Sequence, residues 1–381
     1  MNDLATAPKD ADLFEGFRSP RQTGSAAVLQ NAVIYGFSNL RTQILEQFEA
    51  GQLHHAWLLR GPRGVGKASF VYEIACHLLS GRNNADEAIA NTARHVKSGA
   101  HPRFAELRPT WHEKTKKFRT GISVDDSRKL QWFLNLSASD GGWRVVMVDS
   151  VDALTREAAN ALLKVLEEPG AKTVFFILSH GEKPPLPTII SRCRTVDCRA
   201  LNASEAQRAF LAADTLGRFG KREWDRLAPL AAMDGGHFSP GAAIRYALID
   251  GPAIYQELIS ILRGLPHLDA GRLDRFTGSV SRRAGADRFA AVTALLPLLC
   301  ERMAKAALLS EEAIGLCPIE RGLAQRWANT LDCARFWAEA TSICRHIFAD
   351  QALLNLDPGR TILDIARRLE EEAAARIPTR P

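Results

Sequence analysis

A glycine-rich segment that ends in a lysine is the first place in the chain where the residue types and their spacing predict chemistry. Residues 61–68 read Gly-Pro-Arg-Gly-Val-Gly-Lys-Ala. Gly61, Gly64 and Gly66 would let backbone N–H groups turn towards an anion, and Lys67 would add a positive charge. The helix predicted to follow would direct its positive N-terminal end at the same ligand. The segment therefore predicts a loop that binds the phosphate groups of a nucleotide.

The residue after Lys67 departs from this pattern. Working phosphate loops carry a Ser or Thr there, whose hydroxyl group holds Mg²⁺. This chain has Ala68, which has no ligand atom. Ser69 is adjacent, but successive residues of a helix point about 100° apart, so Ser69 cannot simply replace the missing hydroxyl. The sequence leaves open whether the loop still holds nucleotide, and weak ATP binding is compatible with it.

A second part of the expected nucleotide site also departs from the pattern of an active enzyme. Asp149 ends the apolar segment 144–149, where a carboxylate could coordinate Mg²⁺ beside the phosphate loop. Nucleoside triphosphatases of this type usually follow that aspartate with a glutamate that activates the attacking water. Ser150 stands there instead, and a hydroxyl is a poor general base near neutral pH. With two catalytic parts missing, we expect this chain's own ATP hydrolysis to be weak or absent.

The elements that would position these residues are short apolar strands alternating with helices. Strands are predicted at 56–59, 144–149 and 173–178, and helices at 68–79 and 158–166. This alternation is typical of an α/β fold, with a parallel sheet covered by helices on both faces. Beyond Cys198 the strand signals end and Ala, Leu, Arg and Glu dominate.

Length and composition indicate a globular protein with more than one core. The chain has 381 residues, of which 46% are apolar and 24% charged. No apolar run is long enough to cross a bilayer, and the polar first residues lack the features of a signal peptide. Seven scattered cysteines without a CxxC pair fit a reducing cytoplasm. The net charge of +6 permits contact with a polyanion but is weak evidence alone.

Three segments give the chain a family resemblance. Residues 160–169 read Asn-Ala-Leu-Leu-Lys-Val-Leu-Glu-Glu-Pro, residues 175–178 read Phe-Phe-Ile-Leu, and residues 191–193 read Ser-Arg-Cys. Together with the phosphate loop they resemble the bacterial DNA polymerase III clamp-loader subunits of the AAA+ class. The resemblance is strong over residues 34–198. It implies an AAA+ P-loop sheet followed by a small helical lid and an all-α collar domain.

The expected domain boundaries follow from the resemblance and the change in composition. They are a flexible leader at 1–25, a P-loop domain at 26–199, a helical lid at 200–250 and a helical collar at 251–381. In active relatives an arginine of the lid touches the nucleotide. Arg245 falls one or two positions away from that place, so we assign it no role.

The resemblance also implies a role for Arg192. In this family the arginine of Ser-Arg-Cys is an arginine finger, which stabilises the charge on the ATP phosphates of a neighbouring subunit. A lone arginine would more often be a surface ion-pair residue, and the surrounding motif favours the finger. Cys193 is expected to be a packing residue. If the chain binds nucleotide, the site would be a degenerate one. Its contacts would come from Gly61, Gly64, Gly66, Lys67, Ala68 and Asp149.

The sequence and the resemblance are compatible with two functions. The first is an accessory clamp-loader subunit that sits beside a gamma/tau-like ATPase and a delta subunit. It would help to load a sliding clamp onto primed DNA, with DNA contacts through Lys and Arg side chains. The alternative is a catalytically active gamma/tau-like motor subunit. Ala68 and Ser150 argue against an active motor subunit, because they replace the residue that holds Mg²⁺ and the residue that activates water.

Relatives often carry a four-cysteine zinc module after the phosphate-loop helix. The corresponding stretch 76–102 holds a single cysteine, and the spacing of His77, His95 and His101 matches no common zinc motif. We therefore expect no structural zinc or other bound metal, with Arg82–Lys97 packing without one.

Overall fold

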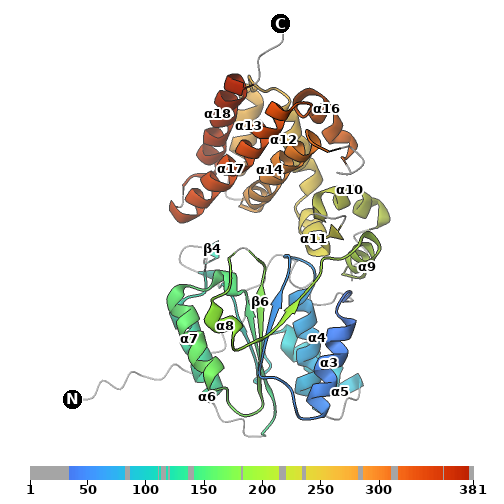
Figure 1. Ribbon diagram of the computed structural model, residues 1–381, viewed down its shortest axis with the longest axis vertical. Coiled ribbons are helices and arrows are strands. Elements are labelled where there is room, and N and C mark those ends of the chain that lie inside the picture. Colours follow the sequence, from blue (N-terminus) through green and yellow to red (C-terminus); the bar gives the residue numbers. More distant parts are fainter. Residues whose placement is uncertain are drawn as a thin grey trace, which may run out of the picture. The chain divides into compact units, whose positions relative to one another are not determined.

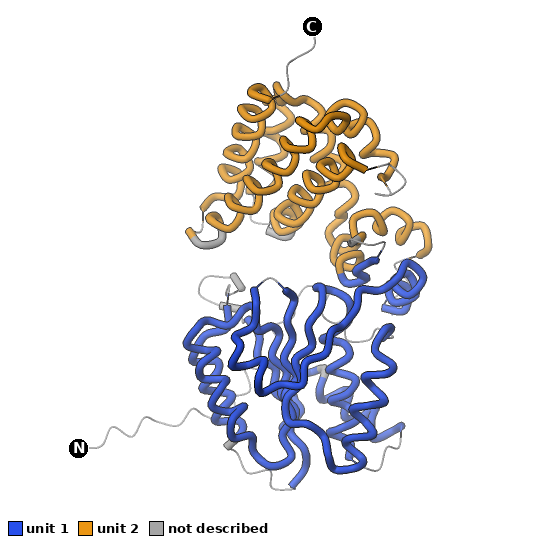
Figure 2. The backbone as a smooth tube through the Cα atoms, viewed as in Figure 1, with its two compact units in different colours: residues 1–218, 233–241 blue, residues 219–232, 242–381 orange. Residues whose placement is uncertain are grey.

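The computed structural model divides the chain into two compact units. It describes residues 34–81, 86–109, 111–112, 117–118, 121–135, 141–181, 183–213, 220–233, 237–281, 286–309, 316–354 and 356–376. Unit 1 comprises residues 1–218 and 233–241, and unit 2 comprises residues 219–232 and 242–381 (Figure 2). The predicted leader lies outside the described residues. The boundaries of the lid and the collar stay predictions.

A five-stranded parallel sheet forms the centre of unit 1, which confirms the predicted fold class. Its order is β2-β5-β6-β1-β7. The strands are β1 (Ala56–Arg60), β2 (Phe104–Leu107), β5 (Arg144–Asp149), β6 (Thr173–Ser179) and β7 (Arg194–Asp197). All three predicted strands are present, and β5 has the predicted bounds.

Alternate side chains of each strand point to opposite faces of the sheet. Both faces are buried, each in its own apolar cluster. Trp57 and Leu59 of β1 join one apolar cluster, and Ala56 and Leu58 join the other. The first cluster is covered by α3 (Ser38–Glu49), α4 (Lys67–Ser80) and α5 (Asp86–Lys97), and the second by α6 (Val124–Asn135) and α7 (Arg156–Glu167) (Figure 1).

The carboxyl ends of β1, β5 and β6 lie together at one edge of the sheet. Strand β6 is hydrogen-bonded to β1 on one side and to β5 on the other. In register, Arg60 faces Ser179 and Asp149 faces Leu178. The segments that follow these three strands must therefore gather at this edge.

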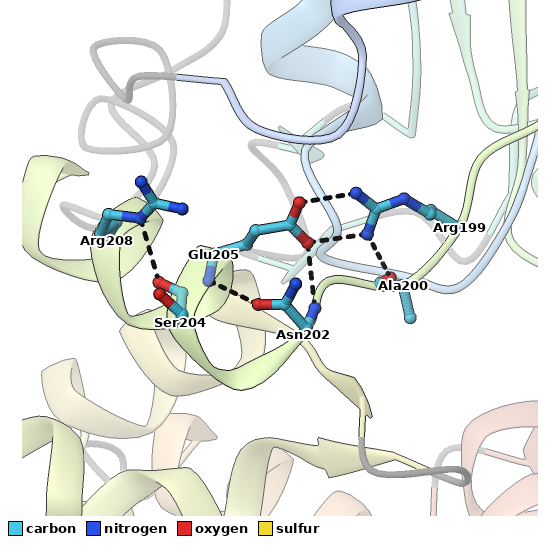
Figure 3. Close-up of polar contacts among 6 residues, drawn as sticks. All are labelled: Arg199, Ala200, Asn202, Ser204, Glu205 and Arg208. Atoms are coloured by element: carbon cyan, nitrogen blue, oxygen red, sulfur yellow. Dashed lines mark hydrogen bonds and ion pairs between the residues drawn. The ribbon is translucent and has the colours of Figure 1, made fainter.

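A polar cap joins the end of the sheet to helix α9 (Ala203–Ala213) (Figure 3). Asn202 Oδ1 accepts from the Glu205 backbone N–H at 2.9 Å, and Glu205 Oε2 accepts from the Asn202 N–H at 3.1 Å. Arg199 donates to both Glu205 oxygens, at 2.6 and 2.7 Å. The Arg199 hydrogen bonds lower the pKa of Glu205 to about 2.

Unit 1 also contains several short elements. The sequence did not indicate the two-residue strands, because two residues show no periodicity. The short elements are β3 (Trp111–His112), β4 (Lys117–Phe118), the 3₁₀ turn η1 (Val151–Ala153), α8 (Pro187–Ile190) and β9 (His237–Phe238); β8 (Ala232–Met233) begins in unit 2.

Unit 2 is built from helices, and its described residues from Gly251 onward are helices and turns, as predicted. Helix α14 packs along α17, and α18 packs against α17 and α13. The helices are α10 (Lys221–Ala231), α11 (Pro240–Leu248, which begins in unit 1), α12 (Gly251–Leu262), α13 (Ala270–Ser281), α14 (Ala286–Ala306), α16 (Pro318–Trp327), α17 (Leu331–Leu354) and α18 (Pro358–Arg376).

A buried polar cluster connects three helices of unit 2. Glu320 of α16 is fully buried and accepts from Arg302 of α14 at 2.6 and 2.8 Å. Tyr255 of α12 donates its hydroxyl to the same carboxylate at 2.5 Å, and the Cys317 N–H donates at 2.8 Å. Although burial opposes ionisation, the Arg302 hydrogen bonds and charge hold the pKa of Glu320 below its ordinary value. The buried charge is thus paired.

Within the described ranges, no helix is long and apolar enough to cross a membrane.

Candidate functional site

The phosphate loop, residues 61–68, joins β1 to α4 as the sequence predicted. Gly64 and Gly66 have φ angles of 83° and 105°, a region that favours glycine. Helix α4 begins at Lys67 with Gly66 as its N-cap, and no side chain caps it. In α-helices generally, the first N–H groups have no partner within the helix, which is why an anion can bind at a loop of this kind.

Lys67 is turned back onto the loop that carries it. Its side chain is enclosed, with 3% of the residue exposed. Its Nζ donates to the carbonyl oxygens of Gly61 at 2.6 Å and of Pro62 at 2.7 Å. Burial lowers the pKa of Lys67 to about 8, although Cys198, Asp149 and Asp152 act in the opposite direction.

A segment of unit 1 that is distant in sequence, residues 239–241, forms hydrogen bonds with the phosphate loop. Ser239 Oγ donates to the Arg63 carbonyl at 2.9 Å, and the Gly241 N–H donates to the Gly64 carbonyl at 2.9 Å. With the two bonds from Lys67, four consecutive loop carbonyls each accept a hydrogen bond. The sequence did not predict this contact, because its partners are 176 residues apart.

The acidic end of β5 is engaged by the segment that follows β6. His180 Nε2 lies 3.1 Å from Asp149 Oδ1. Asp152 Oδ2 accepts from the His180 N–H at 2.8 Å, and its Oδ1 accepts from the Lys183 N–H at 3.2 Å. Burial acts to raise the pKa of Asp152, but these backbone hydrogen bonds outweigh it and hold the pKa below its ordinary value. The sequence did not single out His180.

These residues do not fit Mg²⁺. Ala68 has no oxygen, one Asp149 oxygen is hydrogen-bonded to an imidazole, and both Asp152 oxygens accept backbone N–H groups. Across the described part of the chain, no group of three or more His, Cys, Asp or Glu residues could hold a metal ion. Position 68 therefore supplies no oxygen ligand, and Oδ1 of Asp149 already takes part in a hydrogen bond.

Arg192 lies at the surface, just beyond α8. Its Nη2 donates to Glu167 Oε1 at 2.6 Å, and its Nη1 donates to the Thr188 carbonyl at 3.0 Å and to Ser191 Oγ at 3.3 Å. About a third of the side chain is exposed, at 34%. The guanidinium is thus positioned at the end of α7 and stays accessible from outside the chain.

Cys193 packs partly buried against the cluster that α6 and α7 cover. Burial raises the pKa of its thiol to about 11, so the thiol is protonated near neutral pH and is a poor nucleophile.

The stretch after α4 is helical where it is described. Helix α5 packs against α4, and Val96 lies in the core, with Ile89 and Ala93 packed against it. His101 Nδ1 accepts from the Arg103 backbone N–H at 3.2 Å. Residues 82–85, part of the stretch predicted to pack without metal, lie outside the described residues.

A parallel sheet with a glycine-rich loop after β1, and with an aspartate at the end of β5, is the arrangement of a P-loop fold. Residues 38–202 match the family model described as "DNA polymerase III, delta subunit".

Several proteins of known name are similar to this chain. The DNA polymerase III subunit delta' of Pseudomonas aeruginosa is 34% identical over 216 residues, which cover 56% of this chain and 61% of that protein. Subunit delta' of Escherichia coli is 33% identical over 154 residues, or 40% of this chain and 44% of that protein. Subunit tau of Salmonella typhimurium is 33% identical over 177 residues, or 46% of this chain and 26% of that protein.

The chain is therefore related to DNA polymerase III subunit delta', and the predicted resemblance is confirmed for the P-loop part. The matches span about half the length of the delta' relatives.

Proposed function

We propose that this chain is the delta-prime subunit of a bacterial DNA polymerase III clamp loader. In this role it stands beside a gamma/tau-like ATPase subunit and contributes Arg192 to the ATP site of that neighbour. The guanidinium stabilises the charge that builds up on the phosphoryl oxygens during hydrolysis. ATP-driven loading of the sliding clamp onto primed DNA, in the cytoplasm, is the process that it assists.

The accessible position of Arg192 is the observation that carries this proposal. Its guanidinium is aimed at the surface end of α7, and its charged partner is Glu167, half of whose side chain is exposed. A surface ion pair contributes only about 0–1 kcal/mol, so exchanging this carboxylate for a phosphate of another subunit costs little. Arginine suits the exchange because its fork of donors matches phosphate geometry.

The phosphate loop of the chain supports the same proposal, in which the neighbouring subunit hydrolyses ATP and this chain does not. Ala68, Ser150 and the Asp149–His180 contact deprive it of a metal site and of a general base. We propose that the loop binds nucleotide weakly and turns it over slowly or not at all.

The alternative is an active gamma/tau-like motor subunit. The tau relatives at 32–33% identity favour it. The residues at positions 68, 150 and 180 oppose it, because a motor needs Mg²⁺ and an activated water.

An ATPase assay on the reconstituted complex tests the proposal. The complex contains this chain, its cognate ATPase and delta subunits, the clamp and primed DNA. We expect Arg192→Ala to reduce ATP turnover by roughly 10³-fold, the lower end of the range for an arginine finger. Arg156→Ala, an exposed arginine at the start of α7, is the charge-matched control and should leave turnover close to wild type.

Normal turnover with the Arg192→Ala chain would show that Arg192 is no finger. Magnesium-dependent turnover by the isolated wild-type chain would instead support the motor.

A further inference from the structure

His180 and Asp149 form a contact that takes no part in the proposed role of Arg192. Strand β6 lies between β1 and β5, so His180 follows the strand that separates the phosphate loop from Asp149. Its imidazole reaches to the β5 side and meets the carboxylate at 3.1 Å. Since an ionised carboxylate can only accept, Nε2 must carry the proton of this bond.

The orientation of the ring depends on this one bond. The other ring nitrogen, Nδ1, is buried and has no hydrogen-bond partner among the residues that the structure describes. The side chain is only 11% exposed, so little water reaches it. A buried nitrogen without a partner is unfavourable, and the bond to Asp149 offsets that cost. Asp149 and His180 are therefore held together as a pair.

We propose that His180 excludes Mg²⁺ from this site, and that position 180 together with position 68 sets the metal dependence of nucleotide binding. Magnesium requires nearly octahedral coordination by oxygen atoms at short distances. The imidazole N–H occupies Oδ1 of Asp149, one of the two carboxylate oxygens that a metal, or its bound water, could contact. Restoring a hydroxyl at position 68 alone would leave this second obstacle in place.

The neighbouring carboxylate does not provide a substitute. Asp152 uses one oxygen for the His180 N–H and the other for the Lys183 N–H, so the segment after β6 engages both acidic residues. The loop still offers cationic groups to a phosphate. Lys67 has three donors, and two of them bond to the Gly61 and Pro62 carbonyls.

The inference rests on the proposed function in one respect, namely that the loop is one that no longer hydrolyses ATP. Its test uses the isolated full-length chain and a fluorescent ADP derivative, titrated in MgCl₂ and in EDTA. The variants are Ala68→Thr, His180→Ala and the double variant Ala68→Thr/His180→Ala. A second double variant, Ala68→Thr/His95→Ala, controls for the loss of a histidine, because His95 is exposed on α5.

We expect Mg²⁺ to tighten ADP binding by about tenfold or more in the Ala68→Thr/His180→Ala chain, a size typical of changes beside a metal ligand. The wild type, both single variants and the control double variant should bind ADP equally well, or equally poorly, in MgCl₂ and EDTA.

Two results would overturn the inference. One is magnesium-dependent binding by Ala68→Thr alone that equals that of the double variant. The other is a double variant that melts at the wild-type temperature yet shows no response to Mg²⁺. Neither result bears on Arg192, whose role is measured in the assembled complex.

Discussion

At the scale of single residues, the two cations linked to phosphate chemistry have opposite surroundings. Lys67 is enclosed and bonded to its own loop, and burial lowers its pKa to about 8. Arg192 is partly exposed, and Glu167, the carboxylate with which it pairs in the described part of the chain, is exposed too. The first arrangement limits what a residue can do for a ligand outside the loop. In the proposed function, the second leaves a permanent charge available to another subunit.

Glu205 makes a pH-dependent contribution to stability. Its pKa falls from 4.5 to about 2 on folding, mainly because Arg199 donates to both of its oxygens. Since the folded pKa is the lower one, the stabilisation is complete above pH 4.5 and is lost as the pH falls towards 2. We expect Glu205→Gln to lower the melting temperature at pH 6 and to lower it clearly less at pH 3. A difference of the same size at both pH values would contradict this assignment.

The sequence predicted where the loop and the acidic residue lie in the fold, because both depend on a local pattern. Gly61, Gly64, Gly66 and Lys67 lie in one segment, and Asp149 ends a strand of valines, so both sites could be read directly. His180, Ser239 and Gly241 were missed for a common reason. Their partners are set by strand order and by contacts across long stretches of chain, which no local pattern encodes.

At the scale of elements, prediction succeeded where burial is continuous. Strand β5 was predicted from its continuous apolar run, and helix α4 from the apolar segment that follows the loop. Strand β2 was missed, since it has four residues and includes the charged Glu106. The predicted lid, 200–250, contains α9, α10 and α11, which are divided between the two units.

The start of α11 should be sensitive to side-chain size. A Cβ atom at Gly241 would lie 2.7 Å from the Cα atom of Gly64, so Gly241→Ala must displace the phosphate loop. Such overpacking typically costs about 1–3 kcal/mol of unfolding free energy. Gly278→Ala in α13 is the matched control, because nothing lies near its Cβ position. The control should stabilise the chain by about 0.5–1 kcal/mol, through helix propensity.

Urea unfolding of the two glycine variants measures this difference. Equal free energies of unfolding for both would show that Gly241 does not press against the loop.

At the scale of the whole molecule, each unit has its own means of stabilisation. Unit 1 buries both faces of a sheet, and unit 2 combines an apolar helical core with the Arg302–Glu320–Tyr255 cluster. The residues to which we assign a role in phosphate chemistry, Lys67, Asp149 and Arg192, all belong to unit 1. In the proposed function, unit 2 contributes the helices through which subunits of a clamp loader associate.

Removing one partner from the buried cluster should destabilise unit 2 strongly. Arg302→Met leaves the Glu320 carboxylate buried without its cation, which typically costs about 3–5 kcal/mol. Arg345→Met is the control, because it removes an exposed ion pair with Glu301 and should cost no more than about 1 kcal/mol. Hydrogen exchange can measure both units in one experiment.

We expect faster exchange in α14 and α16 of Arg302→Met, with β6 of unit 1 protected as in the wild type. Equal effects of the two arginine variants would mean that the cluster does not stabilise unit 2.

The central claim is that Arg192 acts on the transition state of a neighbouring subunit, and one binding measurement tests it most directly. ADP with aluminium fluoride mimics the phosphoryl group in transfer, and a finger should strengthen its binding far more than that of ADP alone. In the reconstituted complex we predict that Arg192→Ala weakens ADP–aluminium fluoride binding by roughly 10³-fold. Binding of ADP should change little. Equal affinity of the wild-type and Arg192→Ala complexes for the analogue would contradict the account.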